Sequence, residues 1–369
     1  MRAVLVHPKT PGARVGEVPA PPRPPGSVRV AVEEVGVCGT DRDIAGGEYG
    51  QAPPGRSELI LGHENLGRVV ESDGELPVGT WVVATVRRGC GLCACCAVGR
   101  SDACESGRFT ERGIGGADGY WADEYVERPE WLVVVPPPLA EVAVLTEPLS
   151  VVEKAIRVGL ADRSARRPAE ATAGTLRTLV AGSGAVGMLA ALALRVRGAE
   201  VTVVDRHPGD TAAGRLLARA GASHRGFAEL SQDPAAPRFD LVVEATGAPQ
   251  VAFDLADLLG PNGCLVLTGI PEAGGAPAPE AVGSWARGLV LENRAIVGSV
   301  NAARLDFEAA LSDLAAFEAA WPRLVGSMRT AERPLADAPA VLAGRSAGEI
   351  KTVLKVRGGP GEGPTGRIR

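Results

Sequence analysis

The chain has 369 residues, 45% of them hydrophobic and only 4% aromatic, and a formal net charge of −5. This length allows two domains with sizeable cores built mostly from Val, Leu and Ala. No basic block and no uninterrupted apolar run of ~18 residues occur in the sequence, which argues against nucleic-acid partners and against a membrane span.

The first 150 residues are predicted to be rich in β-structure. Residues 1–6 form a short apolar run, Val alternates with other residues over 28–33, and 81–86 are apolar except for Thr85. Pro and Gly clusters at 19–26 and 53–55 separate these runs. This pattern is typical of a small β-domain with functional loops. The run at 1–6 is too short for a signal peptide, and the clustered cysteines described below fit a reducing cytoplasm, so we expect a cytoplasmic protein.

The middle of the chain predicts alternating helices and strands. A helix is expected over 148–159, with Pro148 in its first turn and Gly159 as its end, followed by an exposed polar connection over 161–175. Such alternation indicates a parallel sheet covered on both faces. The expected strands are 176–181, 200–205, 239–244, 264–268 and 295–300, and the expected helices lie near 185–197, 211–221 and 249–259.

The last part of the chain predicts a helix over 305–320, then short extended pieces from 331 and a return strand at 350–356. The tail, residues 357–369, is rich in Gly and Pro and is expected to be disordered.

A glycine motif between the strand at 176–181 and the following helix predicts a dinucleotide site. Its members are Gly182, Gly184, Ala185, Val186 and Gly187, with Ser183 between the first two glycines. The glycines allow a tight turn, close approach of a pyrophosphate and packing of helix on strand, and the helix N-terminus attracts phosphate. Asp205 ends the next strand, where a carboxylate can accept the ribose hydroxyls of NAD. A glycine-rich surface turn is the alternative interpretation.

The choice between NAD and NADP depends on two neighbouring residues. The carboxylate of Asp205 would repel the 2′-phosphate of NADP, whereas Arg206 can clamp a phosphate. Because Asp205 is aimed from the strand end, we predict that NAD is preferred, with NADP as an alternative.

Four cysteines occur at metal-ligand spacing within a loop rich in small residues. Cys90, Cys93, Cys96 and Cys104 form C-x2-C-x2-C-x7-C, which can close a tetrahedral zinc site without an open position. Such a zinc is structural, and it suits a reducing compartment better than disulfides do. Cys95 breaks the spacing and is interpreted as a spare thiol that could compete for a ligand position.

A second set of possible zinc ligands is more scattered. Cys38, His63, Glu64 and Glu147 are of the ligand types that hold a zinc with one position left for water or substrate. Taken singly, each has an ordinary alternative, because a lone His-Glu pair is usually a surface turn and a lone Cys is usually in the core.

Several motifs together resemble the zinc-dependent medium-chain alcohol dehydrogenases, and among them the glucose 1-dehydrogenases. The resemblance runs from residue 1 to about 356. The general motifs are the segments at 36–41 (GVCGTD), 62–64 (GHE), 182–187 and 243–247 (VEATG), and the four-cysteine loop. The narrower ones are the segments at 110–114 (TERGI), 146–150 (TEPLS) and 297–301 (VGSVN).

This resemblance implies an α/β fold with two domains. Residues 1–150 and 305–356 would form a GroES-like catalytic domain, and 151–304 a Rossmann domain with a doubly wound parallel sheet. It also implies a homo-oligomer, either dimer or tetramer.

The resemblance further implies the roles of individual residues. Cys38, His63 and Glu64 would hold the catalytic zinc, Glu147 would join them directly or through water, and Thr40 would pass on the substrate proton. Glu111, Glu147 and Asn301 match positions that contact the sugar. Thr246, Gly247 and Asn301 would also belong to the cofactor site.

Two positions depart from the pattern of the resemblance. Asp43 stands where many members have the histidine that ends a proton relay, and a carboxylate with an ordinary pKa near ~3.9 is a poor base at neutral pH. Val151 stands where some sugar-oxidising members have an acid. With these two exceptions, the resemblance implies oxidation of an aldose C1 hydroxyl to a lactone. The alternatives are another polyol or secondary alcohol as substrate, and a non-catalytic dinucleotide-binding protein.

Overall fold

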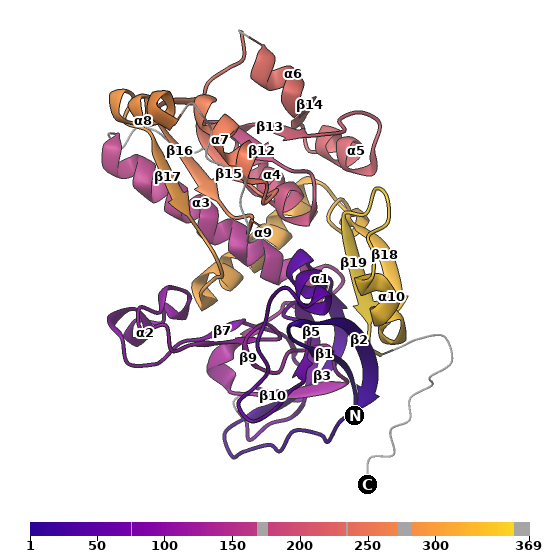
Figure 1. Cartoon of the computed structure of the whole chain (residues 1–369). Coiled ribbons are helices and arrows are strands. Elements are labelled where there is room, and N and C mark those ends of the chain that lie inside the picture. The colour runs from indigo at the N-terminus through magenta and orange to yellow at the C-terminus, as the bar shows by residue number, and fades with distance from the viewer. Residues whose placement is uncertain (75, 168–175, 234, 272–281, 358–369) are drawn as a thin grey trace. The chain divides into compact units, whose positions relative to one another are not determined.

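The computed structural model describes residues 1–74, 76–167, 176–233, 235–271 and 282–357. The chain divides into two compact units (Figure 1). The first contains Met1–Glu147, Ala302–Leu314 and the segment from Arg329 onward, and the second contains Pro148–Asn301 and Ala315–Met328. The expected tail beyond residue 357 lies outside the described residues. Within the described ranges, none of the helices combines the length and apolarity needed to cross a bilayer.

The first unit is built on a seven-stranded sheet with the order β11-β6-β5-β3-β19-β18, and β10 also pairs with β3. The return strand β19 lies antiparallel to β3, which brings residues 353–355 next to residues 34–36. The strands are β3 (Val28–Gly36), β5 (Asn65–Glu71), β6 (Trp81–Ala84), β10 (Glu124–Glu127), β11 (Leu132–Val134), β18 (Arg329–Pro334) and β19 (Lys351–Lys355).

Two three-stranded sheets complete the β-structure of this unit, with the orders β2-β1-β4 and β7-β8-β9. Their strands are β1 (Arg2–His7), β2 (Thr10–Glu17), β4 (Leu59–Ile60), β7 (Arg87–Arg88), β8 (Thr110–Arg112) and β9 (Gly116–Ala117). The helices of the unit are short: α1 (Gly39–Gly46), α2 (Ala94–Ala97), α10 (Ala338–Leu342) and the 3-10 turns η1 (Ser101–Ala103), η2 (Pro129–Trp131), η3 (Pro137–Leu139), η4 (Ala143–Leu145) and η7 (Leu335–Asp337).

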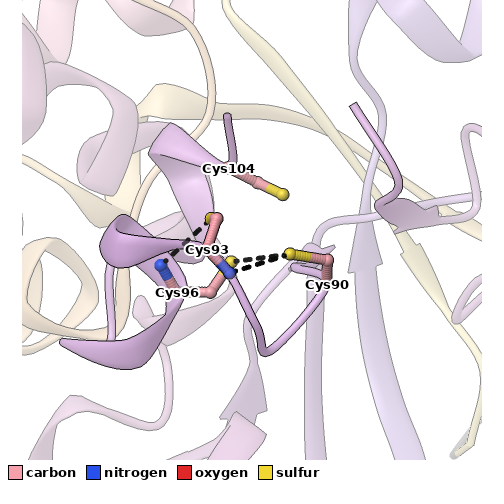
Figure 2. A group of neighbouring side chains, drawn as sticks. All are labelled: Cys90, Cys93, Cys96 and Cys104. Carbon is pink, nitrogen blue, oxygen red and sulfur yellow. Dashed lines mark hydrogen bonds between the residues drawn. The ribbon is translucent and has the colours of Figure 1, made fainter. Parts of the chain in front are cut away.

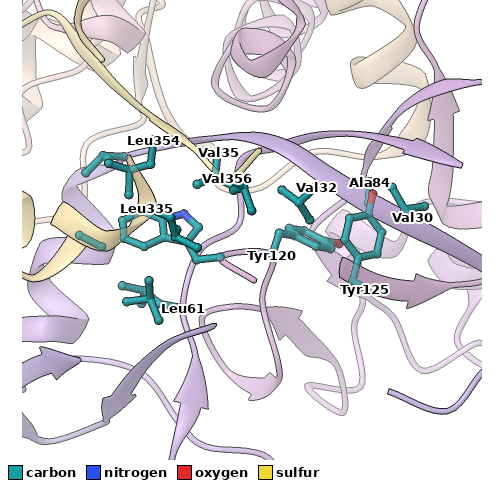
Figure 3. Packing of buried hydrophobic residues seen from close by; sticks show 14 of the residues in the cluster. Val30, Val32, Val35, Leu61, Ala84, Tyr120, Tyr125, Leu335, Leu354 and Val356 are labelled. Atoms are coloured by element: carbon teal, nitrogen blue, oxygen red, sulfur yellow. The ribbon is translucent and has the colours of Figure 1, made fainter. Parts of the chain in front are cut away.

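The core of the first unit packs valines and leucines of the large sheet against two tyrosines (Figure 3). The rings of Tyr120 and Tyr125 lie 4.7 Å apart, and both hydroxyls find partners although they are buried. Tyr125 donates to Asn65 Oδ1 at 3.0 Å, and Tyr120 donates to the carbonyl of Thr85 at 2.8 Å. Satisfying these polar ends lets the large rings fill the core without a desolvation penalty.

The second unit contains a six-stranded parallel sheet with the order β14-β13-β12-β15-β16-β17. Its strands are β12 (Arg177–Ala181), β13 (Glu200–Asp205), β14 (Ser223–Gly226), β15 (Phe239–Glu244), β16 (Leu259–Leu267) and β17 (Ala295–Gly298). The strand order reverses between β12 and β15, and ligands of doubly wound sheets bind at such a switch point.

Helices connect and cover this sheet, with α4 packed on β12 and β13, and α7 on β15 and β16. They are α4 (Ala185–Val196), α5 (Ala212–Arg219), α6 (Phe227–Gln232), α7 (Pro249–Asp257), α8 (Val282–Leu291) and the 3-10 turn η6 (Gly326–Met328). Two longer helices, α3 (Thr146–Arg166) and α9 (Arg304–Ala320), each contribute residues to both units. The six-stranded parallel sheet and the β-rich first unit confirm the expected α/β fold class.

The expectation that a helix ends at Gly159 is wrong, because α3 continues to Arg166. A Cβ at Gly159 would come within 2.6 Å of Leu241 Cδ1 and 2.8 Å of Val266 Cγ2. The glycine therefore lets the helix approach the sheet closely and does not terminate it. Part of the expected polar connection, residues 161–166, is accordingly helical, and residues 168–175 lie outside the described residues.

Candidate catalytic and cofactor sites

The turn from β3 into α1 positions the first candidate ligand. Cys38 is the N-cap residue of α1, and its backbone N–H donates to Asp41 Oδ2 at 2.8 Å. Asp41 is fully buried, and its other oxygen lies 3.3 Å from His63 Nδ1. A carboxylate behind an imidazole fixes the ring orientation and leaves Nε2 for a metal.

The ligand atoms of Cys38, His63 and Glu64 lie within 4.8 Å of one another. His63 and Glu64 are buried, and Cys38 is partly buried. Thiolate, imidazole and carboxylate are zinc ligands, so the donor set fits a zinc with an open position. Gly36 makes room for this arrangement, because a Cβ there would lie 1.8 Å from Glu64 Oε2.

Lys351 is a member of this cluster that the sequence analysis did not identify. Its ammonium donates to Glu64 Oε1 at 2.5 Å and to the carbonyl of Val37 at 3.0 Å, and both charged side chains are buried. The residue comes from β19, which lies beside β3. Burial alone would lower the pKa of Lys351, but the negative charges of Glu64 and Cys38 raise it. Lys351 therefore places a buried positive charge directly against the Glu64 side chain.

Two further groups of the cluster have strongly displaced pKa values. Burial alone would lower the pKa of His63, but the charge of Asp41 and hydrogen bonds with Asp41 and Cys38 raise it well above its usual range. Burial raises the pKa of Glu147 to about 7, and the charges of His63 and Lys351 oppose this increase. Among the described residues, Glu147 is not in the set whose ligand atoms lie within 4.8 Å of one another, so its zinc contact stays a prediction.

Thr40 lies at the start of α1, with its Oγ1 3.9 Å from Cys38 Sγ. This hydroxyl is therefore close to a candidate zinc ligand. Asp43 is on the same helix and is exposed.

The four cysteines of the loop gather around one point (Figure 2). The sulfurs of Cys90, Cys93, Cys96 and Cys104 lie within 4.8 Å of one another, which suits a closed tetrahedral zinc site. The helix α2 contributes to this, since Cys93 caps it and accepts from the Cys96 N–H at 3.5 Å.

Local hydrogen bonds prepare one of these thiols for a metal. A hydrogen bond with Ser106, and backbone N–H groups of Leu92 and Cys93, lower the pKa of Cys90 to about 5. Burial raises the pKa of Cys96 to about 12. Cys95 is in α2 but does not join the four sulfurs, in agreement with its interpretation as a spare thiol. Burial, and then the charge of Glu105, raise its pKa.

Glu111 lies on β8, directly opposite Arg87 on β7. Arg87 donates to Glu111 Oε1 from Nε at 3.0 Å and from Nη2 at 2.9 Å. The side chains are only 10% and 12% exposed. The candidate sugar contact is therefore a well-oriented carboxylate in a largely dry position.

The glycine motif lies at the switch point of the parallel sheet. Gly182 follows β12, Gly184 is the N-cap residue of α4, and Ala185 and Val186 begin the helix. A Cβ at Gly187 would lie 1.9 Å from the carbonyl oxygen of Gly182, so only glycine fits there.

Across the switch point, the end of β15 carries Thr246 and Gly247. The backbone N–H groups of both donate to Glu244 Oε1, at 2.6 and 3.0 Å, and Glu244 is buried. This buried carboxylate fixes the loop beside the glycine motif.

Asp205, at the end of β13, is held by three groups of its own unit. It accepts from Ser183 Oγ, from the backbone N–H of His207 at 2.8 Å and pairs with His224 Nε2 at 3.0 Å. Burial alone would raise the pKa of Asp205, but the bonds from Ser183 and His224 outweigh it and lower the pKa. Arg206, the next residue, is exposed.

Asn301 lies in the second unit, after β17, and has a left-handed backbone with a φ of 61°. Asparagine tolerates this conformation better than most residues. The carbonyl of the preceding residue, Val300, accepts from Lys154 Nζ at 2.8 Å, which anchors the segment.

Asp41, Lys351, Arg87 and His224 were all missed by the sequence analysis. Asp41 had a local signal, since it stands three residues after Cys38, the capping spacing. The other three contact residues that are distant in the sequence, and no spacing in the sequence predicts these contacts.

Two family models match consecutive segments of the chain. The model described as "Alcohol dehydrogenase GroES-like domain" matches residues 24–138, and "Glucose dehydrogenase C-terminus" matches residues 140–356.

Similar proteins cover almost the whole chain. A glucose 1-dehydrogenase of Metallosphaera sedula is 38% identical over 96% of this chain and 98% of its own length. One from Methanocella arvoryzae is 39% identical over 89% of this chain and 92% of its own. The solved structure of Haloferax mediterranei glucose dehydrogenase in complex with NADP, zinc and gluconolactone is 32% identical, has a TM-score of 0.85 and covers 96% of this chain and 99% of that one.

Proposed function

The chain belongs to the glucose dehydrogenase family of the zinc-dependent medium-chain alcohol dehydrogenases, and from this premise we propose that it oxidises the C1 hydroxyl of an aldose such as glucose. The products are the lactone, reduced nicotinamide cofactor and one proton. The likeness to glucose 1-dehydrogenases over nearly the whole chain carries this choice of substrate.

The proposed catalytic zinc is held by Cys38, His63 and Glu64, with Glu147 joining directly or through water. A zinc in such a site acts as a Lewis acid that lowers the pKa of a substrate hydroxyl. Asp41 orients His63, and Lys351 donates a hydrogen bond to Glu64 that holds this side chain in place. The second zinc is structural and is held by the four cysteines of the loop.

The chain's own residues accept the substrate proton and orient the sugar for hydride transfer. Thr40 accepts the proton of the C1 hydroxyl and passes it toward solvent, where Asp43 replaces the usual histidine at the exit. A nicotinamide bound in the cofactor site would accept the C1 hydrogen as hydride, with its two electrons. Glu111, Glu147 and Asn301 accept or donate hydrogen bonds to the remaining sugar hydroxyls and fix the carbon's orientation.

We propose that the cofactor is NAD in preference to NADP. Gly182, Gly184, Ala185, Val186 and Gly187 would hold its phosphates, and Thr246, Gly247 and Asn301 would line the rest of the site. Asp205 would hold the ribose, and its lowered pKa favours a charged carboxylate that would repel a 2′-phosphate. Arg206 could bind the 2′-phosphate of NADP, so NADP stays an alternative cofactor. We also propose that the enzyme is a cytoplasmic homo-oligomer, either dimer or tetramer.

A substrate panel tests the proposal. Initial rates with glucose, other aldoses, polyols and secondary alcohols should be measured with both cofactors, and the product identified as lactone or ketone. We expect lactone from an aldose, and we expect Cys38→Ser or His63→Ala to abolish turnover while cofactor binding stays nearly intact. Ketone from a polyol or secondary alcohol would move the function to that alternative. Cofactor binding without turnover of any substrate would indicate the non-catalytic alternative.

A further inference from the structure

Arg87 lies between the four-cysteine loop and the candidate sugar carboxylate. It is on β7, three residues before Cys90, and its side chain is buried. Its direct cross-strand neighbour on β8 is Glu111. Arg87 therefore adjoins both the start of the four-cysteine loop and Glu111.

The guanidinium of Arg87 makes three hydrogen bonds and one aromatic contact. Nε and Nη2 donate to Glu111 Oε1, and Nη1 donates to the main-chain carbonyl of Asp102 at 2.7 Å. The group also lies over the ring of Phe109, 4.0 Å from its centroid. Asp102 belongs to η1, and the residue directly after η1 is the candidate ligand Cys104. The Arg87 side chain therefore links Glu111 to the segment that carries Cys104, the last of the four cysteines.

We propose that Arg87 is a positioning residue that sets the orientation of Glu111 from the four-cysteine loop, so that closure of this loop by zinc and affinity for the sugar are coupled. The inference rests on the proposed function, because it takes Glu111 as a sugar contact. It assigns the loop a second role beside stability.

The geometry explains why an arginine is needed. A planar guanidinium can bind a carboxylate with two donors and still offer a third in a fixed direction, whereas the single ammonium of a lysine cannot do both. Both donors to Glu111 end on Oε1, so they fix the position of this carboxylate oxygen, and a hydroxyl donor requires an acceptor in a fixed place. When the loop opens, the Asp102 carbonyl moves, and Arg87 loses the anchor that fixes it.

Coupling of this kind is reciprocal. If zinc in the loop increases the affinity for sugar, bound sugar must increase the affinity for that zinc by the same factor. The coupling can therefore be measured either as a change in sugar affinity or as a change in zinc affinity, and the zinc measurement needs no turnover.

The test compares Arg87→Lys with Arg88→Lys as the matched control. Arg88 is the next residue, equally an arginine with ion-pair and ring partners, but its bonds go to Tyr120, Glu127 and Thr85 and it lies over Trp131. Phe109→Leu is a second, milder variant that weakens the stacking under Arg87, in case Arg87→Lys does not fold. Glu111→Gln and the double variant with Arg87→Lys complete the set.

We expect Arg87→Lys to raise the Michaelis constant for glucose about tenfold or more, with less than about twofold change for the cofactor. Phe109→Leu should act in the same direction and Arg88→Lys should not. The double variant should be no worse than Glu111→Gln alone, because both changes remove the same interaction. An unchanged glucose constant in Arg87→Lys, an equal rise in Arg88→Lys, or effects that multiply in the double variant would overturn the inference.

The second readout needs no substrate and separates this inference from the proposed function. Zinc release to a colorimetric chelator is followed in a Cys38→Ser background, so that the four-cysteine loop holds the remaining zinc. Arg87→Lys should release it faster than the parent and than Arg88→Lys; equal rates would overturn the link. If the wild-type enzyme oxidises no aldose, the proposed function fails, and this release rate alone decides the link between Arg87 and the loop.

Discussion

Replacing Lys351 by Met should destabilise the first unit strongly, because it leaves the buried carboxylate of Glu64 without its cationic partner. Both side chains are nearly inaccessible, at 3% and 1% exposed, and the ammonium donates to Glu64 at 2.5 Å. Removing one partner of a buried ion pair costs about 3–5 kcal/mol. For a unit of this size, that free energy corresponds to a fall in Tm of roughly 6–20 °C.

The assay is calorimetric unfolding of four proteins: wild type, Lys351→Met, Glu64→Gln with Lys351→Met, and Lys355→Met. Lys355 is the control on the same strand; it pairs with Glu34, but it is partly exposed and Glu34 also has Arg329 as partner. Its loss should cost only about 0–1 kcal/mol. The double variant should be more stable than Lys351→Met, because the uncompensated charge is gone.

Metal content gives a further check on the same reasoning. A divalent cation beside Glu64 would supply the missing positive charge, so the loss in Lys351→Met should be larger in chelated than in zinc-loaded enzyme. Equal falls in Tm for Lys351→Met and Lys355→Met, or a double variant no more stable than the single one, would refute the role of Lys351.

Three more predictions concern the other sites. Cys90→Ser or Cys104→Ser should lower stability more than it changes the kinetics of the enzyme that remains folded, and metal analysis should find two zinc ions per wild-type chain; one zinc, with freely titratable loop thiols, would contradict this. Glu111→Gln and Asn301→Ala should raise the Michaelis constant for sugar by roughly 5- to 150-fold, as expected for a polar group left unpaired, and unchanged sugar kinetics would remove the sugar-specific part of the account. Asp205→Ala should improve catalytic efficiency with NADP relative to NAD, and a wild type that already favours NADP would show that Arg206 governs the pocket.

The parts of the sites that could be predicted from the sequence are those formed by residues close together in the chain. The glycine motif at 182–187 and the four cysteines between 90 and 104 are short segments whose local geometry follows from residue order. The parallel strands were predicted for the same reason, since each is a short apolar run. The strand β14 was not expected: it is the edge strand of its sheet, and Ser223–Gly226 has no fully buried residue to give an apolar signal.

The residues that tune the sites escaped prediction because their partners are remote in the chain. Lys351 meets Glu64 across 287 residues, and His224 meets Asp205 across 19. Gly159 had a local signal, but that signal was misleading, because a glycine that ends a helix and one that permits close packing look alike in sequence. Contacts of this type follow from strand pairing, which a single sequence does not specify.

Oxidation of glucose carrying deuterium at C1 tests the central claim most directly. With zinc-loaded enzyme, we expect deuterium to be transferred to the reduced nicotinamide and the sugar product to be the lactone, and we expect removal of zinc to stop turnover and its return to restore it. Transfer of no deuterium, a product oxidised at another carbon, or turnover that survives complete loss of zinc would contradict the assignment of this chain as a zinc-dependent aldose 1-dehydrogenase.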